Sequence, residues 1–299
     1  MMLKNFGQME QFVREQSGKK RVALAAAHDA DALGSLMMAV DRGIAEAILI
    51  GRRKEIVRVL DEMGKDAGDF RIIEEEDDRA AADKAVELVH CGEADMPMKG
   101  LMHTSTFMKA ILDKEKGLKE DGNLLSQASV FEIPEKDRFL IISDCAVNID
   151  PDLETKIKIT ENAAALAHTL GIEQPKIAVL SAVEVVNPKI RSTVDAAAMR
   201  ERLSDRYLID GPLALDNAID EAAAPPKGIE SPVAGNADIL IVPDLWSGNI
   251  FSKGLVFFAH LRSAGTLNGL KAPVVMSSRT DTVENKYLSI LTAVLQTIR

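Results

Sequence analysis

The amino-acid sequence predicts an α/β fold with parallel-rich sheets flanked by helices. Short apolar segments alternate with longer helical segments almost throughout the chain, which is typical of parallel strands joined by helices. Residues 239–242 form a continuous apolar run, as expected for a strand buried on both faces of its sheet. The strands at 239–242 and 272–277 each run directly into a polar turn and a helix. Together these observations predict an α/β protein.

The first part of the chain contains four strand-and-helix pairs. The fourth strand leads through Lys99 and Gly100 into its helix. A charged, glycine-bearing segment at 114–123 is expected to form a surface turn or a hairpin tip. The predicted strands cover residues 21–26, 47–50, 71–73 and 96–101, and the predicted helices cover 29–42, 52–63, 79–89 and a segment that starts near Thr104.

The alternation restarts near residue 138. Two prolines and a glycine at 222–228 break regular structure and predict a loop. The predicted strands are 139–142, 177–180, 239–242 and 272–277, and the predicted helices are 151–171, 193–203, one after Gly248 and a final one from near Thr282.

Composition limits the classes of function. A chain of 299 residues can bury a substantial core and is expected to form two domains. Its net charge of −10 argues against a nucleic-acid partner, which requires a basic surface. Two cysteines cannot form a disulfide framework and fit a reducing compartment. The first 20 residues lack the apolar core of a signal peptide, and no apolar run reaches the roughly 18 residues of a membrane span. We therefore expect a cytoplasmic protein that binds neither membrane nor nucleic acid.

The strand at 239–242 is followed by a polar elbow that predicts an anion site. We expect Ser247, Gly248 and Asn249 to supply the N-cap and the conformational freedom for the next helix. The first N–H groups of a helix have no partner within the helix and attract anions. Lys253 lies one turn beyond Asn249, so both side chains can face one crevice.

A second elbow follows the strand at 272–277. Asp281 and Glu284 have the spacing of a capping box at the start of the final helix. Ser278 and Arg279 precede them, and a guanidinium beside a helix N-terminus can hold an anion with two hydrogen bonds. The alternative is that Arg279 and Lys253 are solvated surface cations.

A third elbow presents hydroxyl groups. Thr104, Ser105 and Thr106 follow His103 at the expected start of a helix, where their donors match phosphate oxygens. Lys99 could add positive charge. Alternatively, one of the hydroxyls simply caps the helix.

Other polar groups fit structural roles as well as chemical ones. His28, Asp29 and Asp31 could bind a metal, or the aspartates could cap the helix that follows. Cys145 could be a reactive thiolate or a buried cysteine. The histidine and cysteine spacings do not predict a metal site, and no GxGxxG or Walker A motif is present.

Motifs in the same order along nearly the whole chain resemble those of the phosphate acetyl/butyryl transferase family, its butyryl branch most closely. They are Lys99-Gly-Leu-Met-His-Thr-Ser-Thr106, Ser143-Asp-Cys-Ala-Val-Asn148, Ser181-Ala-Val-Glu184 with Val186-Asn-Pro-Lys189, Asp210-Gly-Pro-Leu213, Pro243-Asp-Leu-x-x-Gly-Asn249-x-x-x-Lys253 and Ser278-Arg279.

This resemblance implies two α/β domains with an architecture like that of isocitrate and isopropylmalate dehydrogenases. One domain would contain residues 1–136 plus 279–299 and the other residues 137–278, with the active site in the cleft between them. The implied reaction transfers a butyryl or similar short acyl group between CoA and inorganic phosphate. It needs no obligatory cofactor, and its partners are acyl-CoA, CoA, phosphate and acyl phosphate. We expect a homodimer or a higher homo-oligomer.

The resemblance also suggests roles for single residues. Ser278 and Arg279 would contact the thiol and the reacting group, Asn249 and Lys253 would line the same cleft, and Thr104 to Thr106 would bind phosphate. Phosphate acetyltransferases carry a proposed basic Asp where this chain has Asn285. Either Asp281 or Glu284 would then take its place, or the thiol would be deprotonated in another way. Three alternatives remain: a phosphate acetyltransferase, a non-catalytic acyl-CoA-binding regulatory module, and a metal-dependent decarboxylating dehydrogenase.

Overall fold

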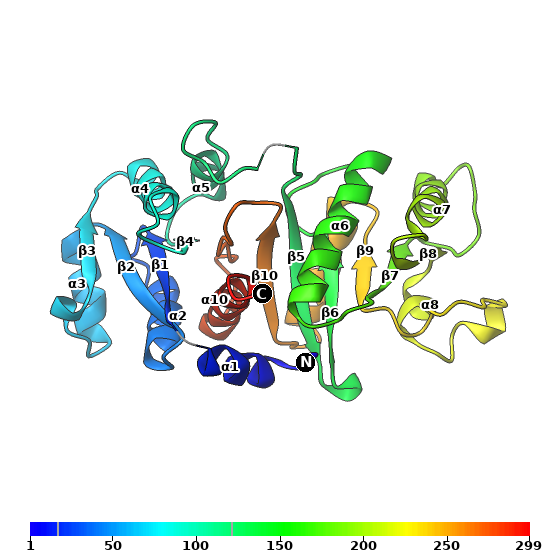
Figure 1. Ribbon diagram of the computed structural model, residues 1–299, viewed down its shortest axis with the longest axis horizontal. Coiled ribbons are helices and arrows are strands. Elements are labelled where there is room, and N and C mark those ends of the chain that lie inside the picture. Colours follow the sequence, from blue (N-terminus) through cyan, green and yellow to red (C-terminus); the bar gives the residue numbers. More distant parts are fainter. Residues whose placement is uncertain (17, 121) are drawn as a thin grey trace. The chain divides into compact units, whose positions relative to one another are not determined.

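The computed structural model describes residues 1–16, 18–120 and 122–299, which form two compact units (Figure 1). The N-terminal unit contains Phe6–Asn123 and Ala264–Arg299, and the central unit contains Met1–Asn5 and Leu124–Ser263. These boundaries differ from the expected 1–136 plus 279–299 and 137–278. Residues 126–133 group with the central unit because they pair with its second strand. The segment before residue 279 groups with the N-terminal unit because Val275 hydrogen-bonds to the backbone of Pro97 and Lys99.

The N-terminal unit contains a four-stranded parallel sheet. Its two inner strands carry the apolar sequences VALA and AILI, which are mostly buried. The strands lie in the order β3 (Arg71–Glu74), β2 (Ala45–Gly51), β1 (Lys20–Ala25) and β4 (Met96–Lys99).

Six helices surround this sheet within the described residues. Side chains of Asp29 and Asp77 cap two of them by accepting backbone N–H groups. The last helix is buried along almost its whole length. The helices are α1 (Phe6–Glu15), α2 (Ala30–Asp41), α3 (Arg53–Glu62), α4 (Asp78–His90), α5 (Thr104–Ile111) and α10 (Val283–Gln296), with a short 3-10 turn at Ala67–Asp69.

The central unit contains five strands side by side. β5 runs antiparallel to β6, and the pairs that follow are parallel. The order is β5 (Ser126–Ile133), β6 (Arg138–Ser143), β9 (Ile239–Ile241), β7 (Lys176–Leu180) and β8 (Leu208–Leu213), and β10 (Ser263–Asn268) begins at the last residue of this unit.

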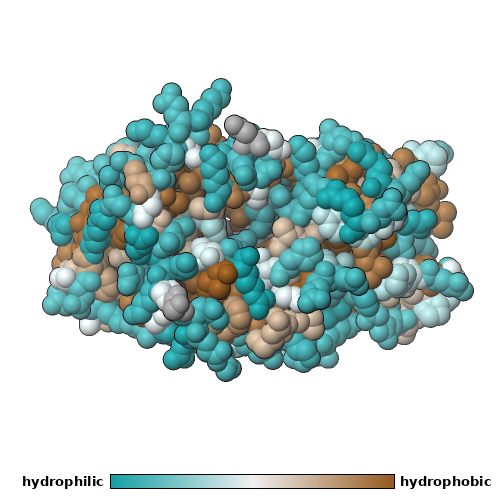
Figure 2. Space-filling view, viewed as in Figure 1, coloured by the Kyte–Doolittle hydropathy of each residue, from teal (hydrophilic) through white to brown (hydrophobic). Residues whose placement is uncertain are grey.

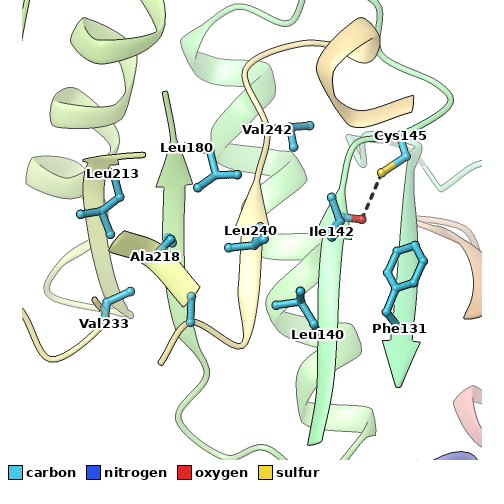
Figure 3. Close-up of a cluster of buried hydrophobic side chains, with 12 residues drawn as sticks. Phe131, Leu140, Ile142, Cys145, Leu180, Leu213, Ala218, Val233, Leu240 and Val242 are labelled. Atoms are coloured by element: carbon cyan, nitrogen blue, oxygen red, sulfur yellow. Dashed lines mark hydrogen bonds between the residues drawn. The ribbon is translucent and has the colours of Figure 1, made fainter. Parts of the chain in front are cut away.

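Helices cover this sheet and enclose an aliphatic core. α6 packs along β6 and β9 on the side turned to the viewer in Figure 1. Figure 3 shows a buried cluster in which side chains of neighbouring strands, such as Leu140 and Leu240, meet. The helices are α6 (Leu153–Thr169), α7 (Arg191–Leu203), α8 (Leu215–Ile219) and α9 (Leu245–Phe257), with 3-10 turns at Pro134–Lys136 and Pro225–Lys227.

The predicted α/β class is confirmed, although several elements differ from expectation. The strand predicted at 272–277 is reduced to isolated bridges at Val274 and Val275. β5, β8, β10 and α1 were not predicted. The turn predicted at 114–123 contains turn and bend residues, and its residue 121 lies outside the described part of the chain.

The surface is mainly hydrophilic on the face shown in Figure 2, with hydrophobic residues scattered between polar ones. Among the described residues, no helix combines the length and the apolar character that crossing a membrane requires.

Candidate functional site

The N-terminus of α5 presents unused hydrogen-bond donors. His103 occupies the N-cap position, and its side chain makes no capping hydrogen bond. The backbone N–H groups of Thr104 and Ser105 have no partner within the described residues, and both residues are exposed. The alternative that one of the three hydroxyls caps this helix is therefore wrong, because Thr104, Ser105 and Thr106 all lie inside it. This helix end has the open donors that an anion site requires.

Close contact with β1 holds the start of α5 in place. The N–H of Gly100 donates to the carbonyl of Ala25 (2.8 Å), and the N–H of Leu101 donates to that of Ala26 (3.2 Å). A Cβ atom on Gly100 would lie 2.3 Å from the Ala26 oxygen, so a larger residue could not take this path.

Lys99 lies beneath this loop and is only 4% exposed. Its ammonium group donates to the carbonyls of Gly100 (3.2 Å) and Met102 (3.4 Å). Burial lowers the pKa of Lys99, and the positive charge of Arg279 lowers it further. The charges of Asp29 and Asp281 act in the opposite direction and raise this pKa, but burial has the largest effect.

Arg279 joins the second elbow to α5. Its Nη2 lies 3.5 Å from Nδ1 of His103, and both side chains are exposed. The guanidinium therefore contacts the side chain of the residue that directly precedes Thr104 and Ser105. We call Lys99, His103, Thr104, Ser105, Ser278, Arg279 and Asp281 the N-terminal cluster.

Asp281 shapes the turn that carries Arg279. Its carboxylate accepts the backbone N–H of Ser278 (2.7 Å), and the Ser278 hydroxyl lies 3.0 Å from that of Thr280. The predicted capping box of Asp281 and Glu284 is wrong. Thr282 caps α10 instead, by accepting the N–H of Asn285 (3.1 Å).

The elbow after β9 differs from the predicted anion site. Asp244 caps α9 by accepting the N–H of Ser247 (2.8 Å), so the helix begins at Leu245 rather than after Gly248. The N–H of Leu245 donates to the carbonyl of Ile149 (3.0 Å). Two of the first N–H groups of α9 are thus occupied, and the capping carboxylate adds negative charge. This helix end is a poorer anion site than that of α5.

Gly248 and Asn249 pack against the loop that follows β6. A Cβ atom on Gly248 would lie 2.4 Å from the carbonyl oxygen of Asp144, so close packing, not conformational freedom, requires this glycine. The Asn249 amide donates to the carbonyl of Cys145 (3.2 Å). Lys253 is exposed one turn further along α9.

Asp144 organises that loop. Its carboxylate accepts backbone N–H groups from Gln127 (3.2 Å), Ala146 (2.8 Å) and Val147 (2.9 Å), and the amide of Asn148 (2.6 Å). Such a network fixes the backbone on which Asn249 rests.

Cys145 is a buried cysteine and not a reactive thiolate. It is 3% exposed, and its sulfur lies 3.5 Å from the carbonyl oxygen of Ile142 (Figure 3). Burial raises the pKa of this thiol well above its usual range, with a further contribution from the charge of Asp144.

The aspartate after β1 has a structural role. Asp29 accepts the N–H of Asp31 (3.3 Å) at the start of α2, as the capping interpretation predicted. His28 is buried, and neither ring nitrogen has a partner in the described part of the chain. Within the same residues, no group of three or more His, Cys, Asp or Glu side chains could hold a metal ion.

A pocket of about 590 Å³ in the central unit was not predicted from the sequence. It lies where β7 and β9 end, and Ser247 is one of its lining residues. Lys156 also lines it and is buried, paired with Asp195. A sequence signal existed, because Lys156 falls on the same helical stripe as the buried Ile159, Thr160 and Ala163.

The predicted site residues thus fall into two groups. The N-terminal unit contains Lys99, His103, Thr104, Ser105, Thr106, Ser278, Arg279 and Asp281, and the central unit contains Ser247, Gly248, Asn249 and Lys253.

Comparison with known proteins finds relatives in the family that the motifs resemble. A phosphate butyryltransferase of Clostridium acetobutylicum is 45% identical and covers 98% of each chain. A phosphate acetyltransferase of Thermotoga maritima is 42% identical over 94% of this chain and 97% of its own.

Solved structures support the same relationship. A branched-chain phosphotransacylase from Enterococcus faecalis V583 superimposes with a TM-score of 0.83 and 34% identity, over 93% of this chain and 98% of its own. A 4-hydroxythreonine-4-phosphate dehydrogenase from Burkholderia phymatum shares the fold, with a TM-score of 0.53 and 16% identity, over 94% and 98% of the two chains. The dehydrogenase-like architecture is therefore confirmed. The family described as "Phosphate acetyl/butaryl transferase" matches residues 79–294. The chain belongs to this family of acyltransferases.

Proposed function

We propose that this protein is a phosphotransacylase that moves a butyryl or similarly short acyl group between CoA and inorganic phosphate. The observation that carries the proposal is the N-terminal cluster, in which Arg279 contacts His103 and the next two residues, Thr104 and Ser105, have open N–H groups. A phosphate or acyl phosphate carries the charge and the acceptor oxygens that this arrangement fits. The similarity to phosphate butyryltransferases supports the choice of acyl donor.

The reaction exchanges one bond for another at the acyl carbonyl carbon. A phosphate oxygen attacks this carbon, a C–O bond forms, the C–S bond breaks, and the departing thiolate takes up a proton to give free CoA. In reverse, a base must remove the thiol proton. Preorganised donors accelerate such a step by stabilising the negative charge that develops on the carbonyl oxygen.

Within this proposal, each residue has a role. Arg279 and the N-terminus of α5 hold the phosphoryl group, with Lys99 contributing charge, and Ser278 contacts the reacting group. Asp281 is a candidate for the base, because its carboxylate lies in the turn that carries Ser278 and Arg279. Glu284 is the second candidate. Asn249 and Lys253 contact CoA. The proposal that both groups of residues serve one active site, in a cleft between the domains, rests on the family resemblance of the motifs.

A thiol-release assay tests this function. Acetyl-, butyryl- and isobutyryl-CoA are each supplied with and without phosphate, and free thiol is followed together with acyl phosphate. We expect thiol release that depends on phosphate and is faster with butyryl- or isobutyryl-CoA. A preference for acetyl-CoA of more than about tenfold in kcat/KM would identify a phosphate acetyltransferase instead. Saturable CoA binding without thiol release would identify a regulatory acyl-CoA-binding module.

We further propose that the enzyme is cytoplasmic, requires no cofactor besides its CoA substrate, and forms a homodimer or a larger homo-oligomer. An apolar stripe on α9 supports assembly. Trp246, Ile250 and Phe257 recur at helical spacing on one face and are more than half exposed, and Phe258 beyond them is 90% exposed. Apolar stripes of this size commonly mark interfaces between subunits.

A further inference from the structure

The pocket in the central unit lies at the edge of a sheet where α/β proteins bind ligands. β7 ends at Leu180 and β9 at Ile241, and residues directly after both strands line the pocket. In parallel sheets, ligands bind beyond the carboxyl ends of the strands. A volume of about 590 Å³ lies within the usual range for a small-molecule site.

Apolar atoms make up most of the surface that lines the pocket, although seven of the thirteen lining residues are polar or charged. Leu180 and Val242 lie at neighbouring strand ends in Figure 3 and contribute to the buried cluster. Leu215 from α8 and Phe251 from α9 are partly buried against the same cluster and complete the apolar lining. This surface fits a hydrocarbon chain better than a phosphate group.

The charged residues that line the pocket already have partners. Lys156 donates to the carboxylate of Asp195 (2.7 Å), and Arg191 lies within 3.3 Å of Asp150 and 3.4 Å of Asp195. Cations that are neutralised in this way have little remaining attraction for an anion.

The hydroxyl groups are paired as well. The hydroxyls of Ser181 and Ser192 lie 2.7 Å apart, and that of Ser247 donates to the Asp244 carboxylate (2.9 Å). The pocket therefore combines apolar surface with polar groups that are already hydrogen-bonded or paired.

We propose that this pocket binds the acyl chain of acyl-CoA, and that Leu215 and Phe251 set the length of chain that is accepted. The inference rests on the proposed phosphotransacylase function. Ser247, which lines the pocket, and Asn249 are close together on α9, so the pocket adjoins residues that we assign to CoA. The thioester carbonyl would lie on the side of Ser247 and the hydrocarbon chain against Leu180, Val242, Leu215 and Phe251.

The experiment measures kcat/KM for acetyl-, butyryl- and hexanoyl-CoA with wild-type protein and four variants. Leu215→Trp fills the pocket, and we expect the butyryl-to-acetyl ratio to fall at least tenfold. Leu215→Ala and Phe251→Leu enlarge it, and we expect the hexanoyl-to-butyryl ratio to rise about fourfold or more, since each buried methylene group contributes about that factor. Leu261→Ala is the matched control, because Leu261 packs against the same cluster without lining the pocket. It should leave both ratios unchanged.

The outcomes separate the two proposals. Absence of thiol release by the wild-type protein with every acyl-CoA would overturn the proposed function and this inference with it. Normal release with ratios that stay within about twofold in all three pocket variants would overturn the inference alone. The same would follow if Leu261→Ala changed the ratios as much as Leu215→Ala did. The ratios are internal to each variant, so partial loss of folded protein does not affect them, and the enlarging variants decide the case if Leu215→Trp does not fold.

Discussion

Nη2 of Arg279 lies 3.5 Å from Nδ1 of His103, although 176 positions separate the two residues in the chain. The contact links the turn before α10 to the N-cap residue of α5. It joins a permanent cation to the N-cap residue of a helix whose first backbone donors have no side-chain cap. Each feature alone is common on protein surfaces, but we propose that together they hold a doubly charged anion.

Arg279→Ala should lower kcat/KM. The loss should correspond to about 2–4 kcal/mol of transition-state stabilisation, the range for removal of one preorganised donor. Arg279→Lys should recover little, because one ammonium cannot replace a planar fork of donors. Steady-state kinetics with butyryl-CoA and phosphate measures both. Arg58→Ala, an exposed arginine of α3, is the control and should retain wild-type activity. Near-normal rates in both Arg279 variants would show that Arg279 is a surface or structural residue without a role in the reaction.

The affinity for phosphate should depend on Lys99 in alkaline solution. The pKa of Lys99 lies below its ordinary value of 10.5, mainly because of burial, and the cation is lost as the pH rises through this lowered pKa. The KM for phosphate should therefore begin to rise at a lower pH than it would if Lys99 had the pKa of an exposed lysine.

Lys99→Arg should move this alkaline limit upward, because a guanidinium stays protonated. The KM for phosphate is measured against pH, with the exposed Lys54→Arg as the control. Identical profiles for wild type and Lys99→Arg would show that Lys99 does not hold phosphate.

Asp281→Asn should separate a base from a positioning group. The amide oxygen can still accept the Ser278 N–H, so the turn should survive and CoA affinity should stay nearly unchanged. If Asp281 removes the thiol proton, transfer from acyl phosphate to CoA should fall by about a hundred- to ten-thousand-fold. Single-turnover kinetics and CoA titration measure the two effects separately.

Two companion variants locate the base if Asp281→Asn stays active. Glu284→Gln tests the second carboxylate. Asn285→Asp restores the carboxylate that phosphate acetyltransferases carry, and higher activity at neutral pH would show that a base can work from that position. Unchanged rates in all three variants would place the base outside this segment.

Gly248→Ala should destabilise the central unit, and Gly254→Ala should not, although both glycines lie in α9. The added methyl group at Gly248 meets the Asp144 carbonyl oxygen at 2.4 Å, whereas nothing lies within 4 Å of the same atom at Gly254. We expect the free energy of unfolding to fall by about 1–3 kcal/mol in Gly248→Ala and to rise by about 0.5–1 kcal/mol in Gly254→Ala. Urea unfolding followed by the fluorescence of Trp246 reports both. Equal midpoints would contradict the close contact.

Ile250→Asp and Phe257→Asp should reduce the size of the assembly, since each places a charge in the apolar stripe of α9. Sedimentation velocity at several protein concentrations measures the change. Val185→Asp is the control, because Val185 is 67% exposed elsewhere in the same unit. If all three variants sediment like the wild type, the stripe is not an interface.

Sequence reasoning was most reliable where burial and periodicity agree. The apolar runs at 139–142 and 177–180 became β6 and β7, and the helix predicted at 193–203 became α7 with a start at Arg191. β5 was missed because its sequence SQASVFEI mixes polar and apolar residues without clear alternation. α1 could have been found, since Phe6, Met9 and Val13 follow helical spacing.

The ends of the helices were less predictable, because several adjacent residues could serve as caps. Asp244, rather than Ser247, caps α9, and Thr282, rather than Asp281, caps α10. Contacts between distant segments decide such choices, as when the Ile149 carbonyl takes the N–H of Leu245. The pocket was invisible for a related reason. Its lining comes from six separate parts of the chain, and no local pattern shows that they meet.

The buried helix α10 has a consequence for biosynthesis. It supplies core residues such as Tyr287, Ile290 and Leu291 to a unit whose other segment ends at Asn123. The ribosome makes the whole of the central unit between those two segments. During translation, the strands β1 to β4 are therefore made long before α10, and the hydrophobic surface that α10 covers stays exposed to water. The central unit differs, because its strands β5 to β9 are all made before α10. A nascent chain stalled before Ala264 would consequently expose this apolar surface on its older half, where a chaperone could bind it.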